Sequence, residues 1–565
     1  MTNGRAMMTQ GTVKSQRPAA VDVAPARGTL TRRNLVAAAA AGAAAAAMGA
    51  LRRGTTALGA AASSRDTVVM APSYVIRSLD PGHTLEPLGE MICHATYDAL
   101  VTLNGEDLSN PRPHVAASWN VTGGGRLYTF TLRRDIRFAS GNPLTSADVK
   151  WSFERVMNLK SNPAFFLDNV AAVTAPDPYT VVLRLRDPQP SIIPILSNGA
   201  LGIVDSKTAA AQGADAGPDA ASRDHAEGYL NSHSLGGGAF ILESHTPNQE
   251  VVLARNPRHW RGAPSIARVV IKNIPEASTQ ALGLERGDLD VATGLGLSNA
   301  QTLSRVPSVT IKNSLIAASF VMMVNTDPEL SGSLANPKII QAIRYALDYD
   351  GILKIAGPGA VRMAGVIPNN LAGALDPREA VKTDRDRAKA LIRESGIASP
   401  RGRMNYASDQ TSFGIQYPIM AQKLQADLAA VGITVELNGL PGAVALGEYR
   451  AAKAPALFGG YVADYPDATD FLVYLPGRLV GKRLRWPATA SAAAGELAHW
   501  GDQAEQEADA RARVALLQKA QRRLLEIGPY IPLFTPALPW GYRADLRGVT
   551  FNSVWGTDFF TVKRT

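Results

Sequence analysis

Residues 457–471 read LFGGYVADYPDATDF, and the rest of the chain is best understood from this stretch. The apolar run 457–463 predicts a buried strand, in which two adjacent glycines allow another backbone or a ligand to come close. The strand should end at Asp464, because Pro466 has no N–H for a strand ladder and biases Tyr465 toward an extended conformation.

Asp464 is therefore expected at a strand exit, with Tyr461 and Tyr465 on either side of it. Such a carboxylate suits a polar or cationic ligand. A solvated turn is the alternative interpretation, because Asp464, Asp467 and Asp470 are all compatible with turns.

The charge of the chain is unevenly distributed. It has 58 basic and 49 acidic residues, a net charge of +9. Residues 1–62 contain eight of the basic residues and one acid, so the remainder has 50 basic and 48 acidic residues, a net charge of +2. No basic stripe with interleaved aromatic residues follows residue 62, so we expect no nucleic-acid partner.

The first 62 residues have the order of an export signal. The pair Arg32-Arg33 precedes an alanine-rich run at 37–50, and the triplet Ala60-Ala61-Ala62 fits a cleavage site. This pattern resembles a twin-arginine signal peptide, with an internal alanine-rich helix as the alternative. The only cysteine, Cys93, lies far from the cleavage region. We therefore expect a periplasmic protein without a lipid anchor.

Strands and helices alternate along the remaining chain, which predicts α/β lobes. Residues 126–133 alternate between apolar and polar, typical of a half-buried strand, and Thr145 with Asp148 has the order of a capping box. Helices are predicted at 338–349, after Asn336-Pro337, and at 505–527.

A series of spaced blocks from about residue 68 to the C-terminus resembles the extracytoplasmic solute-binding proteins of ABC importers. The resemblance is to family 5, which includes oligopeptide-, dipeptide- and nickel-binding proteins. The blocks are 78–81 (SLDP), 97–101 (YDALV), 116–119 (AASW), 128–133 (YTFTLR), 141–145 (GNPLT), 147–155 (ADVKWSFER), 255–264 (RNPRHWRGAP), 287–291 (GDLDV), 343–348 (IRYALD), 428–433 (LAAVGI), 463–466 (ADYP) and 531–534 (IPLF).

The resemblance implies a bilobal type II periplasmic-binding-protein fold of the α/β class, with an extra subdomain on one lobe and crossover strands as the hinge. Lobe I would comprise residues 63–98, 235–312 and 530–565, the extra subdomain 99–234, and lobe II 313–529. One crossover is expected to begin at Gly236-Gly237-Gly238-Ala239-Phe240, where this chain lacks the proline usual in the family.

The resemblance also implies a function: capture of a peptide or peptide-like amine between the lobes, and transient delivery to a membrane permease by a monomer. Asp464 would pair with the ligand amine, Gly460 and Val462 would offer backbone hydrogen bonds, and Tyr461 and Tyr465 would stack. The other lobe would contribute Tyr74, Ile76 and Arg77. No residue that would hold a ligand carboxylate is identified.

Other ligands and other chemistry remain as alternatives. The same fold could bind a nickel chelate, an opine or an oligosaccharide, and a secreted hydrolase is a third class. The eight histidines lack metal-ligand spacing, and no Gly-x-Ser-x-Gly elbow is present. We therefore expect no enzyme activity, no cofactor and no metal site.

Overall fold

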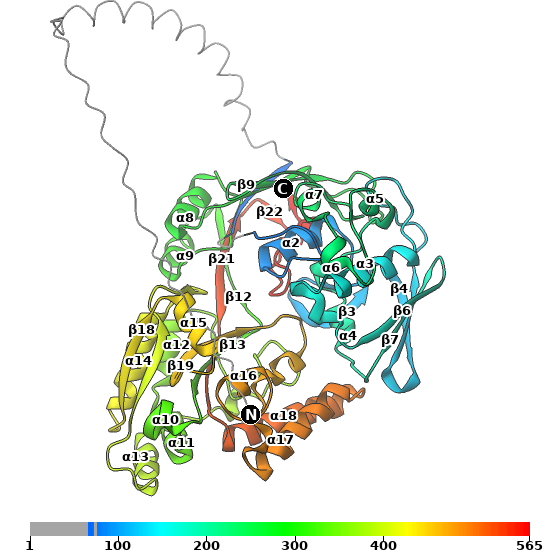
Figure 1. Cartoon of the computed structure of the whole chain (residues 1–565). Coiled ribbons are helices and arrows are strands. Elements are labelled where there is room, and N and C mark those ends of the chain that lie inside the picture. The colour runs from blue at the N-terminus through cyan, green and yellow to red at the C-terminus, as the bar shows by residue number, and fades with distance from the viewer. Residues whose placement is uncertain (1–65, 73–75) are drawn as a thin grey trace, which may run out of the picture. The chain divides into compact units, whose positions relative to one another are not determined.

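The computed structural model describes residues 66–72 and 76–565 of the chain. The predicted signal peptide, residues 1–62, and the predicted site residue Tyr74 lie outside the described residues. The described part contains two large mixed sheets and a smaller antiparallel sheet, with helices packed around them (Figure 1).

The first large sheet has seven strands in the order β12-β21-β11-β1-β10-β9-β8. Its central strand β1 (Thr67–Ala71) pairs in parallel with β10 (Arg268–Lys272) and β11 (Val291–Ala292). One face packs on α2 (Pro87–Thr96), and the other packs on α8 (Ala277–Arg286) and α9 (Leu297–Leu303). The remaining strands are β8 (Phe240–Thr246), β9 (Glu250–Arg255), β12 (Val309–Leu315) and β21 (Ala537–Arg543).

The second large sheet has six strands in the order β14-β20-β13-β19-β15-β18. All seven residues of β13 (Ala318–Val324) are buried, because helices cover both faces of the sheet. The other strands are β14 (Val361–Arg362), β20 (Tyr530–Thr535), β19 (Ala456–Val462), β15 (Arg401–Ala407) and β18 (Thr434–Leu440).

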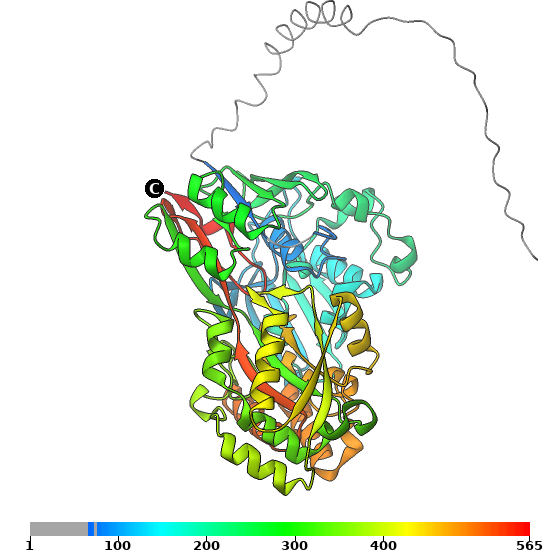
Figure 2. The same ribbon diagram turned by 90° about the vertical axis from the view of Figure 1, so that its left-hand side faces the viewer.

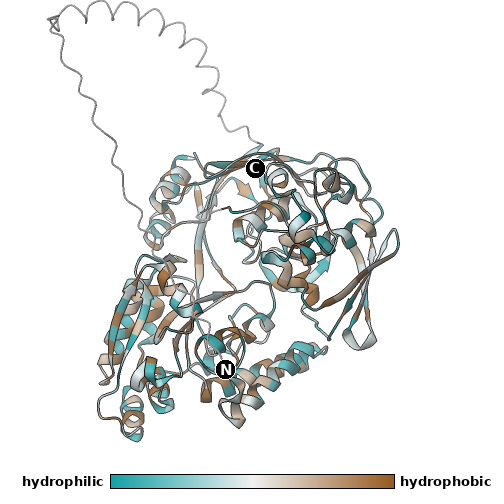
Figure 3. Cartoon of the chain, viewed as in Figure 1, coloured by the Kyte–Doolittle hydropathy of each residue, from teal (hydrophilic) through white to brown (hydrophobic). Residues whose placement is uncertain are grey.

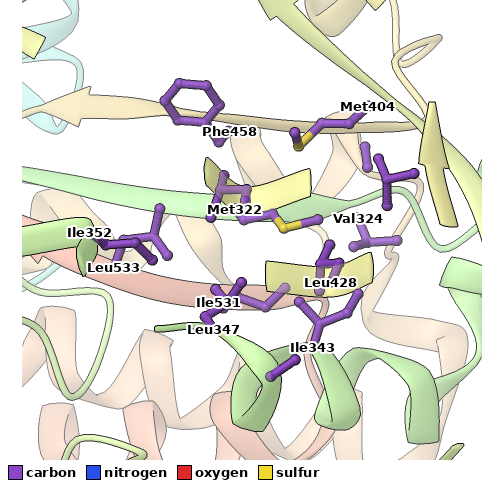
Figure 4. Packing of buried hydrophobic residues seen from close by; sticks show 14 of the residues in the cluster. Met322, Val324, Ile343, Leu347, Ile352, Met404, Leu428, Phe458, Ile531 and Leu533 are labelled. Carbon is purple, nitrogen blue, oxygen red and sulfur yellow. The ribbon is translucent and has the colours of Figure 1, made fainter. Parts of the chain in front are cut away.

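One face of this sheet forms the largest apolar core of the described chain. Met322 and Val324 of β13 meet Ile343, Ile352 and other residues of α11 (Pro337–Ala346), α12 (Tyr349–Ala356), α13 (Arg385–Glu394) and α14 (Tyr417–Ala429) (Figure 4). The opposite face packs on α16 (Leu479–Arg483), α17 (Ala492–Gln506) and α18 (Ala510–Ile527).

Two connections link the large sheets. β12 leads through Ile316 and Ala317 into β13, and β20 leads through Pro536 into β21. Figure 2 shows β12 and β21 side by side on the path between the sheets. The predicted boundaries at 313 and 530 are misplaced, because β12 stays in the seven-stranded sheet to Leu315 and β20 pairs with β13 in the six-stranded sheet.

The glycine run 236–238 is a close-packing site and not a crossover between the large sheets. A Cβ atom at Gly236 would lie 2.2 Å from the carbonyl oxygen of Thr96, and one at Gly238 would lie 2.4 Å from the Thr96 carbonyl carbon. The run leads into β8, an edge strand of the seven-stranded sheet. The crossover predicted here is therefore wrong: glycine is required because the backbone at the end of α2 comes so close.

Residues between the first strand and β8 include a four-stranded antiparallel sheet with its own apolar core. Its helix α3 (Ser146–Leu159) begins with the predicted capping box, since Thr145 N–H donates to Asp148 Oδ2 over 2.9 Å. A short hairpin, β2 (Val101–Asn104) and β3 (Asp107–Pro113), precedes this sheet. The four strands, in spatial order, are β4 (Ala116–Thr122), β5 (Leu127–Leu132), β7 (Thr180–Leu185) and β6 (Val170–Asp177).

Two predicted long helices are each interrupted at an aspartate. The predicted helix 338–349 ends at Ala346, and Asp348 caps α12 by accepting from Gly351 N–H. The predicted helix 505–527 is the end of α17 followed by α18, which Asp509 caps by accepting from Ala512 N–H. Each carboxylate satisfies an otherwise free N–H group and so starts a new helix.

Helix α18 illustrates how the outer helices pack. Its buried stripe consists of Leu517, Ala520, Gln521 and Leu524, while half of its other positions are hydrophilic (Figure 3). Within the described ranges, no helix combines the length and the apolar content needed to span a membrane.

Candidate ligand-binding cleft

Strand β19 carries the predicted site residues and has one partly free edge. It pairs with β13 along its whole length, but with β15 only at Leu457. The N–H of Ala463, just after the strand, donates to the Ala317 carbonyl over 2.7 Å on the β13 side. Because backbone groups alternate along a strand, those of Gly460 and Val462 are directed to the opposite edge.

The predicted burial of this strand is only partly correct. Phe458 is 2% exposed, whereas Val462 is 40% exposed. The reason is the divergence of β15 after Leu457, which leaves the end of β19 without a neighbouring strand.

Two aspartates share one tyrosine hydroxyl just after β19. Tyr461 Oη lies 3.1 Å from Asp464 Oδ2 and 3.2 Å from Asp470 Oδ1. The backbone N–H of Asp464 donates to Asp470 Oδ2 over 2.7 Å. A hydroxyl has one hydrogen, so it cannot fully satisfy both carboxylates at once.

Burial raises the pKa of both aspartates. For Asp464, burial is the dominant cause, and the hydrogen bond from Tyr461 opposes it. For Asp470, which is 5% exposed, burial raises the pKa furthest and the neighbouring charge of Asp464 adds to the effect. The two carboxylates therefore form a site that favours a proton or another cation.

Asp464 and Val462 line a cavity of about 300 Å³ together with residues from the seven-stranded sheet and its helix α2. Glu90 of α2 is a second carboxylate in this wall, and it is 4% exposed. Burial raises the pKa of Glu90 well above its usual value, and the charge of Asp464 raises it further. The apolar part of the wall includes Met70, Leu85, Leu88, Met91, Ile316, Phe413, Phe551 and Val554.

A hydrogen bond connects this loop to the four-stranded domain. Asn198 Nδ2 donates to the carbonyl of Asp464 over 3.4 Å, and Asn198 Oδ1 accepts from Ala200 N–H over 2.8 Å. The ring of Tyr465 packs against the core of the same domain. The loop after β19 thus contacts elements on the other side of the cavity, and Tyr465 has a packing role.

Gly460 and Tyr461 line a different cavity, of about 410 Å³, which is confined to the six-stranded sheet and its helices. It lies beside the free edge of β19 and is covered by α15 (Gly442–Arg450), which packs against β15. The ring of Tyr461 contacts Tyr474, with centroids 6.2 Å apart. Tyr461 therefore separates the two cavities, since its hydroxyl reaches Asp464.

The predicted residues of the other lobe lie elsewhere. Ile76 borders a very small pocket with Pro72 and Leu88, and it is packed on the core of the seven-stranded sheet. The side chain of Arg77 is 77% exposed and pairs with Glu86 over 3.5 Å. Neither residue lines the cavity that contains Asp464.

Sequence reasoning missed Glu90, Asp470 and Asn198 as parts of this site. Glu90 had one signal, since it is an acid within the apolar sequence of α2, between Leu88 and Met91. In the sequence, Asp470 is only one of three aspartates compatible with a turn, and nothing near Asn198 indicates a contact with residue 464. These contacts join segments far apart in the chain.

Comparison with known proteins agrees with this architecture. The chain is 26% identical to the probable D,D-dipeptide-binding periplasmic protein DdpA of Escherichia coli strain K12, over 87% of this chain and 93% of that protein. It is 25% identical to the di/tripeptide-binding protein 2 of Pseudomonas aeruginosa strain UCBPP-PA14, over 91% of this chain and 99% of that protein.

The fold is also similar to that of HbpA2 from Haemophilus parasuis, with a TM-score of 0.76, 22% identity, and coverage of 88% of this chain and all of that chain. The profile described as bacterial extracellular solute-binding proteins, family 5 Middle, matches residues 110–478. The chain therefore belongs to the family 5 extracellular solute-binding proteins of bacteria, with the two-lobed α/β fold that its sequence predicts.

Proposed function

We propose that this protein is the substrate-binding component of an ABC importer and that it captures a peptide or peptide-like amine. The observation that carries this proposal is the pair of carboxylates, Glu90 and Asp464, which face one apolar cavity from different lobes. None of the described residues that line this cavity is basic. An ammonium group would supply the missing positive charge, and the apolar wall would accept the rest of the ligand.

An ammonium group fits the hydrogen bonding as well as the charge. It brings three donors, whereas Tyr461 offers a single hydrogen to Asp464 and Asp470. A charge-assisted hydrogen bond in such a site contributes about 2 to 3 kcal/mol. Loss of the Asp464 charge should therefore weaken binding roughly 30- to 150-fold.

The same arrangement would couple binding to closure of the lobes. Two like charges on opposite walls repel, and a cation between them removes that repulsion. The two connections at 316–317 and at 536 would serve as the hinge. We divide the chain accordingly into lobe I (66–98, 235–315 and 537–565), an extra subdomain (99–234) and lobe II (316–536).

The similarity to the D,D-dipeptide-binding periplasmic protein DdpA and to the di/tripeptide-binding protein 2 supports a peptide ligand, and the similarity to DdpA supports a periplasmic location. We further propose that residues 1–62 are a twin-arginine signal peptide and that the mature protein is a monomer without a lipid anchor. It would release its ligand to a membrane permease during a transient encounter and would carry out no chemistry on that ligand.

The test uses the mature chain with dipeptides and tripeptides, their N-acetylated forms and a panel of sugars. We expect free peptides to raise the melting temperature, N-acetylated peptides to have a much weaker effect, and mass spectrometry to find the ligand intact. Stabilisation by sugars alone would contradict the peptide assignment, and ligand turnover would contradict a binding-only role.

Matched variants test whether the carboxylates of Asp464 and Glu90 bind the ligand. Asp464→Asn and Glu90→Gln should both weaken binding of the free peptide, with the larger loss for Asp464→Asn. The control Asp350→Asn changes an exposed aspartate on α12 and should bind as the wild type does. Equal affinity of all three variants would refute the proposed role of the cleft carboxylates.

A further inference from the structure

A third cavity, of about 450 Å³, lies apart from the two cavities of the cleft region. Its wall comes from residues 102–114, which include the hairpin β2–β3, from position 133 just after β5, from positions 260–261 and from residues 548–561. No described residue lines both this cavity and one of the other two. We call it the basic pocket, because its wall contains three arginines: Arg112, Arg133 and Arg261.

The positive charge of the basic pocket is largely unbalanced. None of the ion pairs formed by the described residues includes any of its three arginines. Asp558 is the single acid among the described residues of the wall, and its Oδ1 accepts from Phe560 N–H over 2.9 Å. The histidine of the wall, His114, has its own acidic partner, since its Nε2 lies 2.9 Å from Asp98 Oδ1. A cavity lined mainly by charge of one sign attracts ligands of the opposite sign, here anions.

Aromatic rings hold two of the arginines in place. The guanidinium of Arg133 lies 4.9 Å from the ring centroid of Trp260, and its Nε donates to the His114 carbonyl over 2.8 Å. The guanidinium of Arg261 lies 3.8 Å from the ring centroid of Phe560. These contacts leave the terminal N–H groups of both side chains available as donors. Because the side chains are already positioned, an anion that binds them loses little affinity to side-chain ordering.

The chemistry and size of the basic pocket favour an organic phosphate. Guanidinium groups bind phosphate oxygens through paired hydrogen bonds, and a phosphomonoester carries close to two negative charges near neutral pH. A cavity of about 450 Å³ lies within the range of small-molecule sites, roughly 300 to 1,000 Å³, so it can hold more than a bare ion. The side chains of Leu103, Pro113 and Trp260 supply apolar surface for the rest of the molecule.

We propose that the basic pocket is a second binding site, in which Arg112, Arg133 and Arg261 bind the phosphate group of a phosphomonoester. This phosphate belongs either to a small soluble molecule or to a lipid headgroup, and the recognition chemistry is the same for both. The basic pocket is opposite in charge to the cavity of Asp464, whose described wall contains carboxylates and no basic residue. The proposed site therefore does not depend on the peptide-binding function.

The test titrates the mature chain with glycerol 3-phosphate, inorganic phosphate and sulfate, with affinity measured by calorimetry. Co-sedimentation with vesicles that contain phosphatidic acid tests the lipid source, and vesicles of phosphatidylglycerol, a phosphodiester, are the control. We expect Arg112→Gln and Arg261→Gln each to weaken binding of the phosphomonoester roughly 10- to 100-fold. Arg261→Lys, which keeps the charge, should recover part of the loss.

Two further variants separate this site from general effects of charge and folding. Arg184→Gln removes the same charge from an exposed position of β7, outside the basic pocket, and should bind phosphate as the wild type does. Asp464→Asn changes the other cavity and should leave phosphate binding unchanged. Melting temperatures without ligand report whether each variant is folded.

The outcomes identify the source of the phosphate or overturn the site. Binding of glycerol 3-phosphate supports a soluble ligand, whereas sedimentation with phosphatidic acid alone supports a lipid headgroup. Equal affinity for sulfate, or equal sedimentation with phosphatidylglycerol, would contradict recognition of a phosphomonoester. Unchanged binding by Arg112→Gln and Arg261→Gln, or no binding of any probe by the wild type, would refute the site. Peptide capture is measured with peptides and stands or fails separately.

Discussion

Tyr461 contacts two of the aspartates that follow β19. Its single hydroxyl hydrogen lies between two carboxylates, and its ring packs edge-on against Phe471 at 5.5 Å. Burial raises the pKa of Asp464 and of Asp470, because both lose hydration without gaining a cationic partner. The apo site therefore competes for protons, and an amine ligand would replace the proton with an ammonium group.

The pH dependence of stability follows from Asp470. The pKa of Asp470 in the folded protein lies well above the ordinary value of 3.8. At a pH between the ordinary pKa and the folded pKa, the native state therefore binds more protons than the unfolded state. The contribution of Asp470 to stability is therefore greatest at low pH and is lost as pH rises through the folded pKa. Asp470→Asn removes this titration while it keeps one acceptor oxygen.

We expect the stability of the wild type, relative to Asp470→Asn, to fall as the pH rises above the ordinary aspartate pKa of 3.8 and through the raised pKa of folded Asp470. Urea unfolding of both apo proteins across this range measures the difference. A difference in unfolding free energy that stays constant, or that grows in favour of the wild type with rising pH, would contradict the assignment.

At the scale of elements, a buried arginine of α3 forms ion pairs that hold this helix to the turn after β1. Arg155 donates to Asp80 and to Asp224, in both cases with a shortest distance of 2.7 Å. All three side chains are at most 2% exposed. Burial opposes ionisation, but the guanidinium of Arg155 lowers the pKa of both Asp80 and Asp224 below the usual value, so both aspartates stay charged. This group joins the four-stranded domain to the segment that leads into α2.

Arg155→Met would leave two charged carboxylates buried without a partner. We expect it to lower the unfolding free energy by about 3 to 5 kcal/mol, because breaking one side of a buried ion pair costs far more than the pair contributes. Arg522→Met is the control, since its pair with Glu379 is 49% and 39% exposed and should matter little. Thermal and urea unfolding measure both, and equal effects of the two changes would contradict the prediction.

At the scale of the whole molecule, two short connections separate two large cores. The loop after β19 nevertheless contacts the four-stranded domain, through Asn198 and through the packing of Tyr465. A ligand that bridges Glu90 and Asp464 would strengthen this contact between lobes. Binding should therefore shift the population toward the closed arrangement.

Spin labels report this closure directly. Glu285→Cys on α8 and Asp350→Cys on α12 place labels on exposed positions of the two lobes, while the native Cys93 is fully buried. We expect the distance between the labels to shorten and its distribution to narrow when peptide is added. The pair Asp350→Cys and Lys389→Cys lies within one lobe and should not respond. An unchanged distance between lobes on saturation would contradict hinge closure.

The sequence predicted much at the level of segments because local rules act there. The strand at 127–132, the capping box at Thr145 and the N-cap at Asn336 each depend on neighbouring residues only. The same local reasoning failed at Asp348 and Asp509, where an aspartate divides one periodic pattern into two helices. It also misassigned the glycines at 236–238, whose constraint comes from the distant backbone of Thr96.

The sequence by itself determined the family and the α/β class, because these depend on motif order and on local strand and helix patterns. The tertiary structure alone brought Glu90 to the cavity of Asp464, gathered three arginines around the basic pocket and moved Arg77 away from both. The physical reason is that charge pairing and cavity shape depend on which distant segments meet. A local sequence pattern does not indicate which distant segments meet.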